Sequence, residues 1–363
     1  MPEFGPLIMT YSVAFVGTGP DPENTVGGES FAMAYRHAAG YQTVDDCELE
    51  ACADLVRENA EAFAERHGIR EGGVYRDYEA MVDDVEPDIV SVCTPVPTHA
   101  SIVVDLVRSG LVDAVHCEKP MAHTWGKARL MAQQADQFDV QLTFNHQRRF
   151  AAPWRRAKEL LADGEIGALD RVEMGGSNFF DHGTHYVDLC NFYADESPVE
   201  WVIGQFDYRD EDVRYGVHNE NHMLASWEYA NGVDGFASTG VGRDVVGAAH
   251  RLVGTDGQIE VDPSDAPETP LRVRRAGDPS WERIRTGDSN AIHENVRHVV
   301  DCLGSGKEPE TGARNALRAT EVIFAAYESA RRRGRVELPL EVEDHPLEAL
   351  VEAGDVTLSD SVE

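Results

Sequence analysis

The chain has 363 residues, which is enough for two domains that each bury a core. Its 65 acidic residues exceed its 32 basic ones by 33, and only four of the basic residues are lysines, a balance that predicts a salt-adapted, halophilic surface. A nucleic-acid partner is excluded because such a protein needs a basic face, and a generally solvated acidic surface is favoured over an acidic binding patch.

The cysteines and the hydropathy indicate a cytoplasmic protein. The six cysteines are scattered without a CxxC pair, so we expect reduced thiols, mostly in the core. No apolar run approaches the ~18 residues that a membrane helix needs. The first eight residues have neither a cationic n-region nor an apolar h-region, so no export signal is expected, and Met9 is a candidate start.

The first predicted strand, residues 11–16, runs into a glycine turn. Gly17 and Gly19 follow the strand, and a helical pattern begins near residue 30. Such a turn lets backbone N–H groups approach a pyrophosphate at the start of a helix. The third glycine of the usual fingerprint is displaced, so we interpret Pro20 to Val26 as an insertion with Gly28 in the third role.

The second predicted strand, 49–53, ends at Asp54, and a helix follows over 57–67. A carboxylate at the end of the second strand can accept both ribose hydroxyls and repels a 2′-phosphate, which favours NAD over NADP. Arg57 keeps NADP open, and a helix N-cap is the alternative role for Asp54.

The rest of the first half alternates strands and helices. A strand over 88–93 is closed by a loop holding Thr94, Pro95 and His99, and a helix over 100–109 leads to the strand that ends at Glu118 and Lys119; one more strand, 141–145, ends at Asn145. This alternation predicts a parallel, doubly wound sheet, in which ligands collect at the carboxyl ends of the strands.

A second group of polar residues follows the junction between the halves. Arg148 and Arg149 precede a helix over 153–162 and are interpreted as pairing with the acidic surface. Residues 172–181 read as a loop. If a helix begins at Gly183, then Asp181, His185 and Asp188 lie on one face. The alternative is an N-capping Asp181 and a structural His185.

The remaining chain predicts an antiparallel sheet and two helices. The sheet strands and closing helices are expected over 199–208, 222–229, 235–241, 251–253, 258–261, 291–303 and 313–332. His218, Glu220 and His222 share one strand face but leave a metal ligand set unclosed, so we predict a polar face or a substrate contact and no metal. Residues 341–363 are expected to form a solvated acidic tail.

Together, Gly17-Thr18-Gly19, Asp54, Thr94-Pro95 with His99, and Glu118-Lys119-Pro120 resemble the Gfo/Idh/MocA oxidoreductases. The resemblance implies an α/β Rossmann domain over 1–147 and an α+β domain with a large, mostly antiparallel open sheet over 148–340. It also implies that Glu118 and Lys119 line the nicotinamide pocket. Asp181, His185 and Asp188 match the family's D-x-G-x-H-x-x-D motif, in which the histidine is the catalytic acid/base.

We therefore expect an NAD(P)-dependent dehydrogenase of a sugar, cyclitol or related polyol. Lys119 steadies the developing alkoxide, His185 titrates near working pH and takes the proton, and Asp181 orients the imidazole or relays the proton. Asn145 and Asp188 are expected to bind the substrate. An NAD-dependent glycosidase or isomerase without net redox change, and a non-catalytic nucleotide sensor, are the alternatives. Relatives often form homodimers or homotetramers, which is expected here by analogy.

Overall fold

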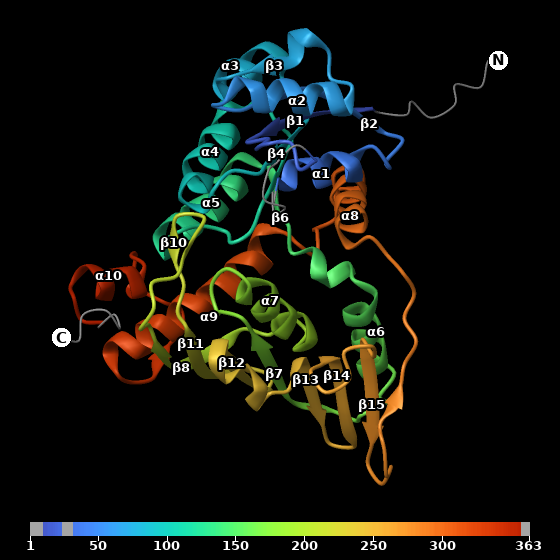
Figure 1. Cartoon of the computed structure of the whole chain (residues 1–363), viewed down its shortest axis with the longest axis vertical. Coiled ribbons are helices and arrows are strands. Elements are labelled where there is room, and N and C mark those ends of the chain that lie inside the picture. Colours follow the sequence, from blue (N-terminus) through green and yellow to red (C-terminus); the bar gives the residue numbers. More distant parts are fainter. Residues whose placement is uncertain (1–9, 24–31, 357–363) are drawn as a thin grey trace. The chain divides into compact units, whose positions relative to one another are not determined.

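The computed structural model describes residues 10–23 and 32–356 (Figure 1). The chain divides into two compact units. The first takes in the described residues of 1–118 together with 130–145 and 292–313, and the second takes in 119–129, 146–291 and the described residues from 314 on. Against the predicted boundary after residue 147, the division falls after residue 145, residues 119–129 belong with the second unit, and residues 292–313 belong with the first.

The first unit is a doubly wound sheet. Its described strands form a six-stranded parallel sheet in the order β3-β2-β1-β4-β5-β6. The strands are β1 Tyr11–Val16, β2 Cys47–Ala53, β3 Val74–Tyr75, β4 Ile89–Val92, β5 Ala114–Cys117 and β6 Gln141–Phe144. The helices are α1 Met33–Tyr41, α2 Arg57–His67, the short η1 Glu71–Gly73, α3 Tyr78–Val85, α4 Val96–Ser109, α5 Trp125–Phe138 and α8 Ala291–Ser305. The order of strands reverses between β1 and β4, where this class of sheet binds its ligand.

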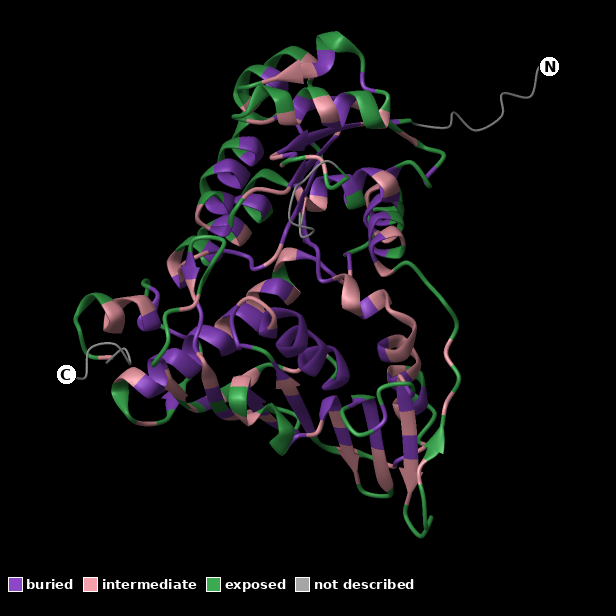
Figure 2. Ribbon diagram, viewed as in Figure 1, coloured by how far each residue is buried: buried purple, intermediate pink, exposed green. Residues whose placement is uncertain are grey.

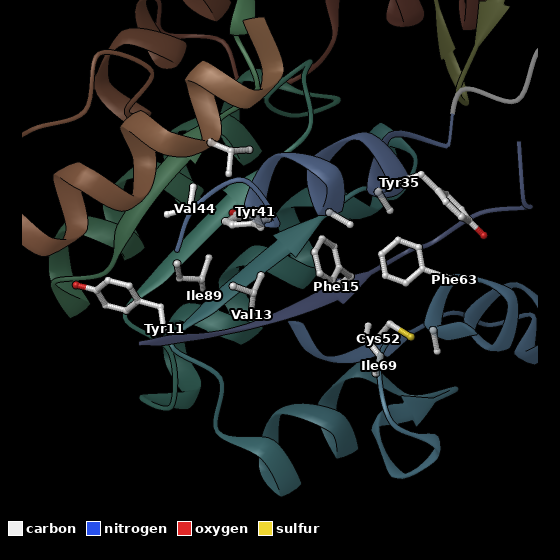
Figure 3. Packing of buried hydrophobic residues seen from close by; sticks show 14 of the residues in the cluster. Tyr11, Val13, Phe15, Tyr35, Tyr41, Val44, Cys52, Phe63, Ile69 and Ile89 are labelled. Atoms are coloured by element: carbon white, nitrogen blue, oxygen red, sulfur yellow. The ribbon is translucent and has the colours of Figure 1, made fainter. Parts of the chain in front are cut away.

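One apolar cluster holds β1 against the helices around it (Figure 3). Phe15 on β1 is fully buried and contacts Phe63 of α2, with ring centroids 5.0 Å apart. Val296 of α8 is also fully buried, and a Cβ placed on Gly40 of α1 would lie 3.1 Å from its Cγ2. This contact explains why α8 belongs to the first unit: its apolar stripe completes that core, although the chain reaches it only after most of the second unit.

The second unit is built on a mixed sheet. Within the described residues it has nine strands in the order β16-β15-β14-β13-β7-β12-β11-β8-β17, all antiparallel neighbours except the parallel pair β7 and β12. The strands are β7 Leu169–Gly176, β8 Val199–Asp207, β11 His222–Tyr229, β12 Asp234–Thr239, β13 Ala248–Gly254, β14 Gly257–Pro263, β15 Leu271–Arg275, β16 Glu282–Arg283 and β17 Val336–Glu337. The short strands β9 Val213–Arg214 and β10 Val217–His218 pair separately. The predicted fold class is therefore confirmed.

The central strand β7 was not predicted, because its residues Leu169 to Gly176 overlap a segment that we interpreted as a loop. Its apolar residues Leu169, Val172 and Met174 are interrupted by three charged ones, and the strand ends in two glycines. Tertiary pairing on both sides makes it a strand. Only residues 177–182 separate β7 from the next helix, which begins at Gly183, so that the start of this helix lies close to the sheet.

Helices cover one face of this sheet. They are α6 Ala152–Ala162, α7 Gly183–Tyr193 and α9 Ala313–Arg332, with the short helices η2 Gln147–Phe150 and η3 Gly240–Val245 elsewhere in the unit. Gly204 of β8 approaches α9 closely, since a Cβ there would lie 2.8 Å from the carbonyl oxygen of Ala326. Figure 2 shows α7 buried along its whole length, and every one of its residues is buried. Polar side chains on α7 therefore need partners inside the protein.

The segment after residue 340 is not a solvated tail as far as the structure describes it. It contains α10 Pro346–Glu352, where Leu347 is fully buried. His345 caps this helix and is 2% exposed, with its ring stacked on Tyr327 of α9 at 5.5 Å. The acidic composition of the segment led to the prediction of a tail, but the buried side chains of Leu347 and His345 pack this segment against the second unit. All six cysteines are free thiols, as predicted.

Candidate active site

The glycine turn after β1 lies beside the loop after β4. Gly17 has φ of +82°, and a Cβ on it would lie 2.5 Å from Cγ2 of Thr94. Gly19 has φ of +65°. Glycine is thus required at position 17 both by its backbone conformation and by the close approach of Thr94. The structure brings these two predicted cofactor elements together at the point where the strand order reverses; Gly28 lies outside the described residues.

Asp54 closes the same corner from the end of β2. Its Oδ2 accepts hydrogen bonds from the backbone N–H of Gly19 at 2.9 Å and from the hydroxyl of Thr18 at 3.2 Å. Its Oδ1 accepts from the N–H of Val56 at 2.9 Å, just before α2. The carboxylate thus lies beside the glycine turn, where a dinucleotide ribose is held in this fold. Arg57 pairs instead with Glu61 on the exposed side of α2.

His99 supports the Thr94 loop from inside. The helix α4 begins at Val96, so the predicted loop up to His99 is in fact shorter. His99 is fully buried, and its Nε2 donates to the carbonyl oxygen of Thr94 at 2.8 Å. The predicted cofactor residue Pro95 is exposed and immediately precedes this helix. His99 therefore shapes the loop that Thr94 and Pro95 present.

Glu118 and Asn145 meet in a buried polar network. Oε1 of Glu118 accepts from Nδ2 of Asn145 at 2.6 Å and pairs with Nε2 of His37 at 2.9 Å. Asn145 also accepts from Nδ2 of Asn295 on α8 at 3.1 Å. Asn145 is fully buried with both ends of its amide engaged, which differs from its predicted role as a substrate ligand. It fixes Glu118 instead.

Sequence reasoning missed His37, which lies on α1 far from Glu118 in the chain. The ring is fully buried, with Nδ1 2.8 Å from the hydroxyl of Ser91. Burial by itself lowers the pKa of His37, but Cys93 and Glu118 beside the ring outweigh burial and raise that pKa to about 10. No local pattern signals a partner 81 residues away.

In the second unit, Lys119 and Asp181 form an ion pair. Nζ of Lys119 donates to Oδ1 of Asp181 at 2.9 Å and to its carbonyl oxygen at 3.2 Å. The side chains are 19% and 13% exposed, so the pair is shielded but reachable. The N–H of Asp181 donates to Oδ1 of Asn219 at 3.0 Å. Asp181 thus orients the lysine ammonium, whereas we predicted that it would orient the imidazole of His185.

His185 lies one turn into α7 and is 5% exposed. Its Nδ1 is buried and has no hydrogen-bond partner among the described residues. Burial lowers the pKa of His185 well below 6.5, and the positive charges of Lys119 and Arg148 lower it further. The ring is therefore neutral at neutral pH, which corrects the prediction that it titrates near working pH. A neutral imidazole is ready to accept a proton.

Arg148 and His182 extend this cluster, and neither role was predicted. Nη2 of Arg148 donates to Nε2 of His182 at 3.3 Å. Burial, then Arg148 and Lys119, lower the pKa of His182 to about 4. Arg148 was expected to pair with the acidic surface; its guanidinium instead lies over the rings of Tyr186 and Trp154, 5.1 and 5.4 Å from their centroids.

Asp188 faces away from solvent toward Arg149. Its two carboxylate oxygens accept from Nε and Nη2 of Arg149 at 2.7 and 2.8 Å, and both side chains are 1% exposed. Arg149 also reaches Glu196 at 2.6 Å. The expected pairing of Arg149 with the acidic surface is therefore wrong. Asp188, predicted to bind substrate, has both oxygens engaged in a buried ion pair that anchors α7.

Residues 218–222 form hydrogen bonds that support the loop carrying Asp181. Glu220 is 1% exposed, and it accepts from the N–H of Phe179 at 2.6 Å and from the hydroxyls of Thr239 and Tyr327 at 2.9 and 2.5 Å. His218 pairs with Tyr208. Among the described residues no cluster of three or more His, Cys, Asp or Glu side chains could hold a metal ion. Glu220 and its neighbour Asn219 thus hold the loop that carries Asp181.

This geometry fits a dinucleotide in the first unit and proton transfer in the second. The reversal of strand order, the glycine turn that only glycine can form and the acidic end of β2 all suit NAD. The second unit offers a cation, Lys119, beside a neutral buried imidazole, His185. None of the described helices combines the length and hydropathy needed to span a membrane. The fold and the site define an oxidoreductase with an NAD-binding Rossmann domain.

The comparisons identify the family. A model described as "Oxidoreductase family, NAD-binding Rossmann fold" matches residues 25–146, and one described as "Oxidoreductase family, C-terminal alpha/beta domain" matches residues 168–338. The chain therefore belongs to the Gfo/Idh/MocA oxidoreductases, and it is an NAD(P)-dependent enzyme.

Among curated relatives, a D-apiose dehydrogenase of Paraburkholderia graminis is 26% identical over 343 residues, covering 86% of this chain and 88% of that protein. A D-glucoside 3-dehydrogenase of Escherichia coli is 35% identical over 229 residues, covering 54% of this chain and 63% of that protein. The crystal structure of an aldose-aldose oxidoreductase from Caulobacter crescentus, complexed with glycerol, has a TM-score of 0.74 at 22% identity and covers 91% of this chain and all of that one. That likeness shows the shared fold.

Proposed function

We propose that the protein is a dehydrogenase that transfers hydride between a secondary hydroxyl of a sugar, cyclitol or related polyol and a nicotinamide. Bound NAD(P) supplies the hydride acceptor. The names of the relatives, a D-apiose dehydrogenase and a D-glucoside 3-dehydrogenase, support a polyhydroxy substrate. NAD is preferred in this proposal because Asp54 stands where a 2′-phosphate would be repelled, while NADP stays open.

The observation that carries the proposal is the ion pair of Lys119 and Asp181 beside the neutral imidazole of His185. Removing hydride from a secondary alcohol leaves a hydroxyl proton to be taken up and a negative charge on oxygen to be stabilised. In the proposed mechanism Lys119 donates a hydrogen bond to that oxygen, and His185 accepts the proton. Asp181 holds the ammonium in place through its 2.9 Å contact. In the reverse direction the imidazolium returns the proton.

The cofactor would be held by the backbone of the glycine turn at Gly17 and Gly19, and by Asp54. Thr94 and Pro95 would form the opposite side, shaped by His99, and Glu118 would line the nicotinamide end. The buried network of Asn145 and His37 around Glu118 supports this assignment by fixing that carboxylate in one orientation. Gly28, the third predicted glycine, is part of the proposal from sequence alone.

Lys119→Met tests the proposal. Wild type is first screened with sugars and inositols, with NAD⁺ and NADP⁺, and steady production of NADH is expected. Lys119→Met should lower kcat by about 10²- to 10³-fold because the group that stabilises the alkoxide is lost. Lys127→Met removes an exposed lysine and serves as the matched control, with wild-type rates expected. Unchanged activity in Lys119→Met discards the mechanism. Substrate conversion without net NADH formation points to the glycosidase or isomerase alternative.

We also propose a cytoplasmic homodimer or homotetramer. The free thiols are consistent with a reducing compartment. The sheet face opposite α9 exposes Ile203 and Leu224, 46% and 45% of their surface, on neighbouring strands β8 and β11. Burial of such side chains would favour self-association. Salt adaptation stays a prediction from the acidic composition.

A further inference from the structure

Arg148 is a cation without a carboxylate partner beside the proposed catalytic residues. Within the described part of the chain no carboxylate oxygen forms an ion pair with it, whereas its neighbour Arg149 pairs with both Asp188 and Glu196. This is unexpected in a protein with 65 acidic residues and 32 basic ones. Since no carboxylate of the described chain forms an ion pair with it, the guanidinium is available to bind an anionic group of a ligand.

The guanidinium is held in a fixed position. It lies over the rings of Tyr186 and Trp154, and Nη2 donates to His182. The support beneath it is itself rigid, because His250 accepts from the indole N–H of Trp154 at 3.2 Å and donates to the carbonyl oxygen of Tyr186 at 3.0 Å. A preorganised guanidinium loses little conformational freedom on binding an anion.

The local charge also favours an anion. The charge of Lys119 is matched by Asp181, and the imidazoles of His182 and His185 are neutral because burial and the two cations lower their pKa. Arg148 therefore leaves the cluster with one net positive charge. Asp262 lies within range of this charge. Burial raises the pKa of Asp262 and the charge of Arg148 lowers it, but the two side chains do not form an ion pair.

We propose that Arg148 binds a carboxylate of the substrate, so that the preferred substrates are acidic sugars such as uronates or aldonates. The inference rests on the proposed function and narrows its substrate class. A carboxylate near the reacting carbon would accept two parallel N–H bonds from the planar guanidinium. The neutral polyols of the broader proposal lack this contact.

The test compares matched substrates that differ only at C6, where the sugar has a hydroxymethyl group and the acid a carboxylate: D-glucose with D-glucuronate and D-galactose with D-galacturonate, at saturating NAD⁺. For wild type, kcat/KM should be about 10- to 100-fold higher for the acid of each pair, the worth of one or two charged hydrogen bonds. Arg148→Met should lose this preference, with kcat/KM for the acids falling by about the same factor relative to the neutral sugars. Arg148→Lys keeps the positive charge but loses the planar guanidinium, and it should retain part of the preference for the acids.

Controls and a second readout separate the two proposals. Arg156→Met removes an arginine whose ion pair with Glu159 is half exposed, and the acid preference should stay. Calorimetry of D-glucuronate with the NADH complex should show binding that weakens in Arg148→Met and at high salt. A wild type that prefers the neutral sugars, or an Arg148→Met that loses both classes equally, overturns the inference while the dehydrogenase proposal stands. If no sugar is oxidised, the dehydrogenase proposal fails, and glucuronate binding that depends on Arg148 still decides the inference.

Discussion

The buried ion pair between Arg149 and Asp188 allows a sharp test of which α7 residues are structural. We expect Asp188→Asn to destabilise the second unit strongly. The substitution keeps the size of the side chain but leaves the guanidinium, 1% exposed, without its bidentate carboxylate. Breaking a buried pair in this way costs about 3–5 kcal/mol, and the remaining contact with Glu196 places the expected loss at about 3 kcal/mol.

Calorimetric melting measures this effect. A loss of about 3 kcal/mol corresponds to a fall in Tm of roughly 10 °C for a unit of this size. Glu159→Gln is the matched control, because it makes the same carboxylate-to-amide change in the half-exposed pair with Arg156, where about 0.5 kcal/mol or less is expected. Below the melting range, the KM of Asp188→Asn for substrate should be close to that of wild type. An unchanged Tm with a raised KM would instead make Asp188 a substrate ligand, as the sequence suggested, and refute the reasoning from burial.

Two further predictions concern pH. Because burial and the cations Lys119 and Arg148 lower the pKa of His185 well below 6.5, the base form persists into mild acid, and kcat/KM should fall only at pH values well below 6.5; a limb centred near pH 7 in a rate profile would contradict this. Burial raises the pKa of Glu220 to about 7 against the opposing bonds from Tyr327 and Thr239. A raised folded-state pKa means that stability from this group is present below pH 4.5 and is lost as pH rises to about 7, by about 3 kcal/mol. In Glu220→Gln the amide oxygen can accept from Phe179 and Thr239, and the amide N–H can donate to the hydroxyl of Tyr327. This variant should therefore gain stability relative to wild type between pH 5 and pH 8 in denaturant titrations, and parallel curves for the two proteins would show that Glu220 does not titrate there.

The sequence predicted the elements whose residues carry their own signal. Apolar runs and alternation identified β1 and β11 with their observed bounds, and helical spacing with polar ends identified α2, α7 and α9. The glycine turn at Gly17 and the Glu118-Lys119-Pro120 segment marked the strand ends from which the site is built. These features are local, because secondary structure and tight turns depend on residues close together in the chain.

Other features depended on residues far apart in the chain. Only the tertiary structure shows that α8 completes the core of the first unit, because its apolar stripe fits several partners equally well. The polar pairs also could not be predicted from the sequence. Lys119 pairs with Asp181, 62 residues away, and Glu118 pairs with His37, 81 residues away. A charged side chain has many candidate partners in the sequence. Because leaving a charge buried without a partner costs free energy, the pair that forms is the one that the fold brings together.

The sequence by itself determined the class of fold, the strand ends that carry the site and the residue types available there. The tertiary structure decided the state and role of those residues. Burial makes His185 neutral, Asp188 forms a buried ion pair with Arg149, and the guanidinium of Arg148 lies over the rings of Tyr186 and Trp154. Solvent exclusion and distance set these outcomes, and neither can be read from spacing along the chain.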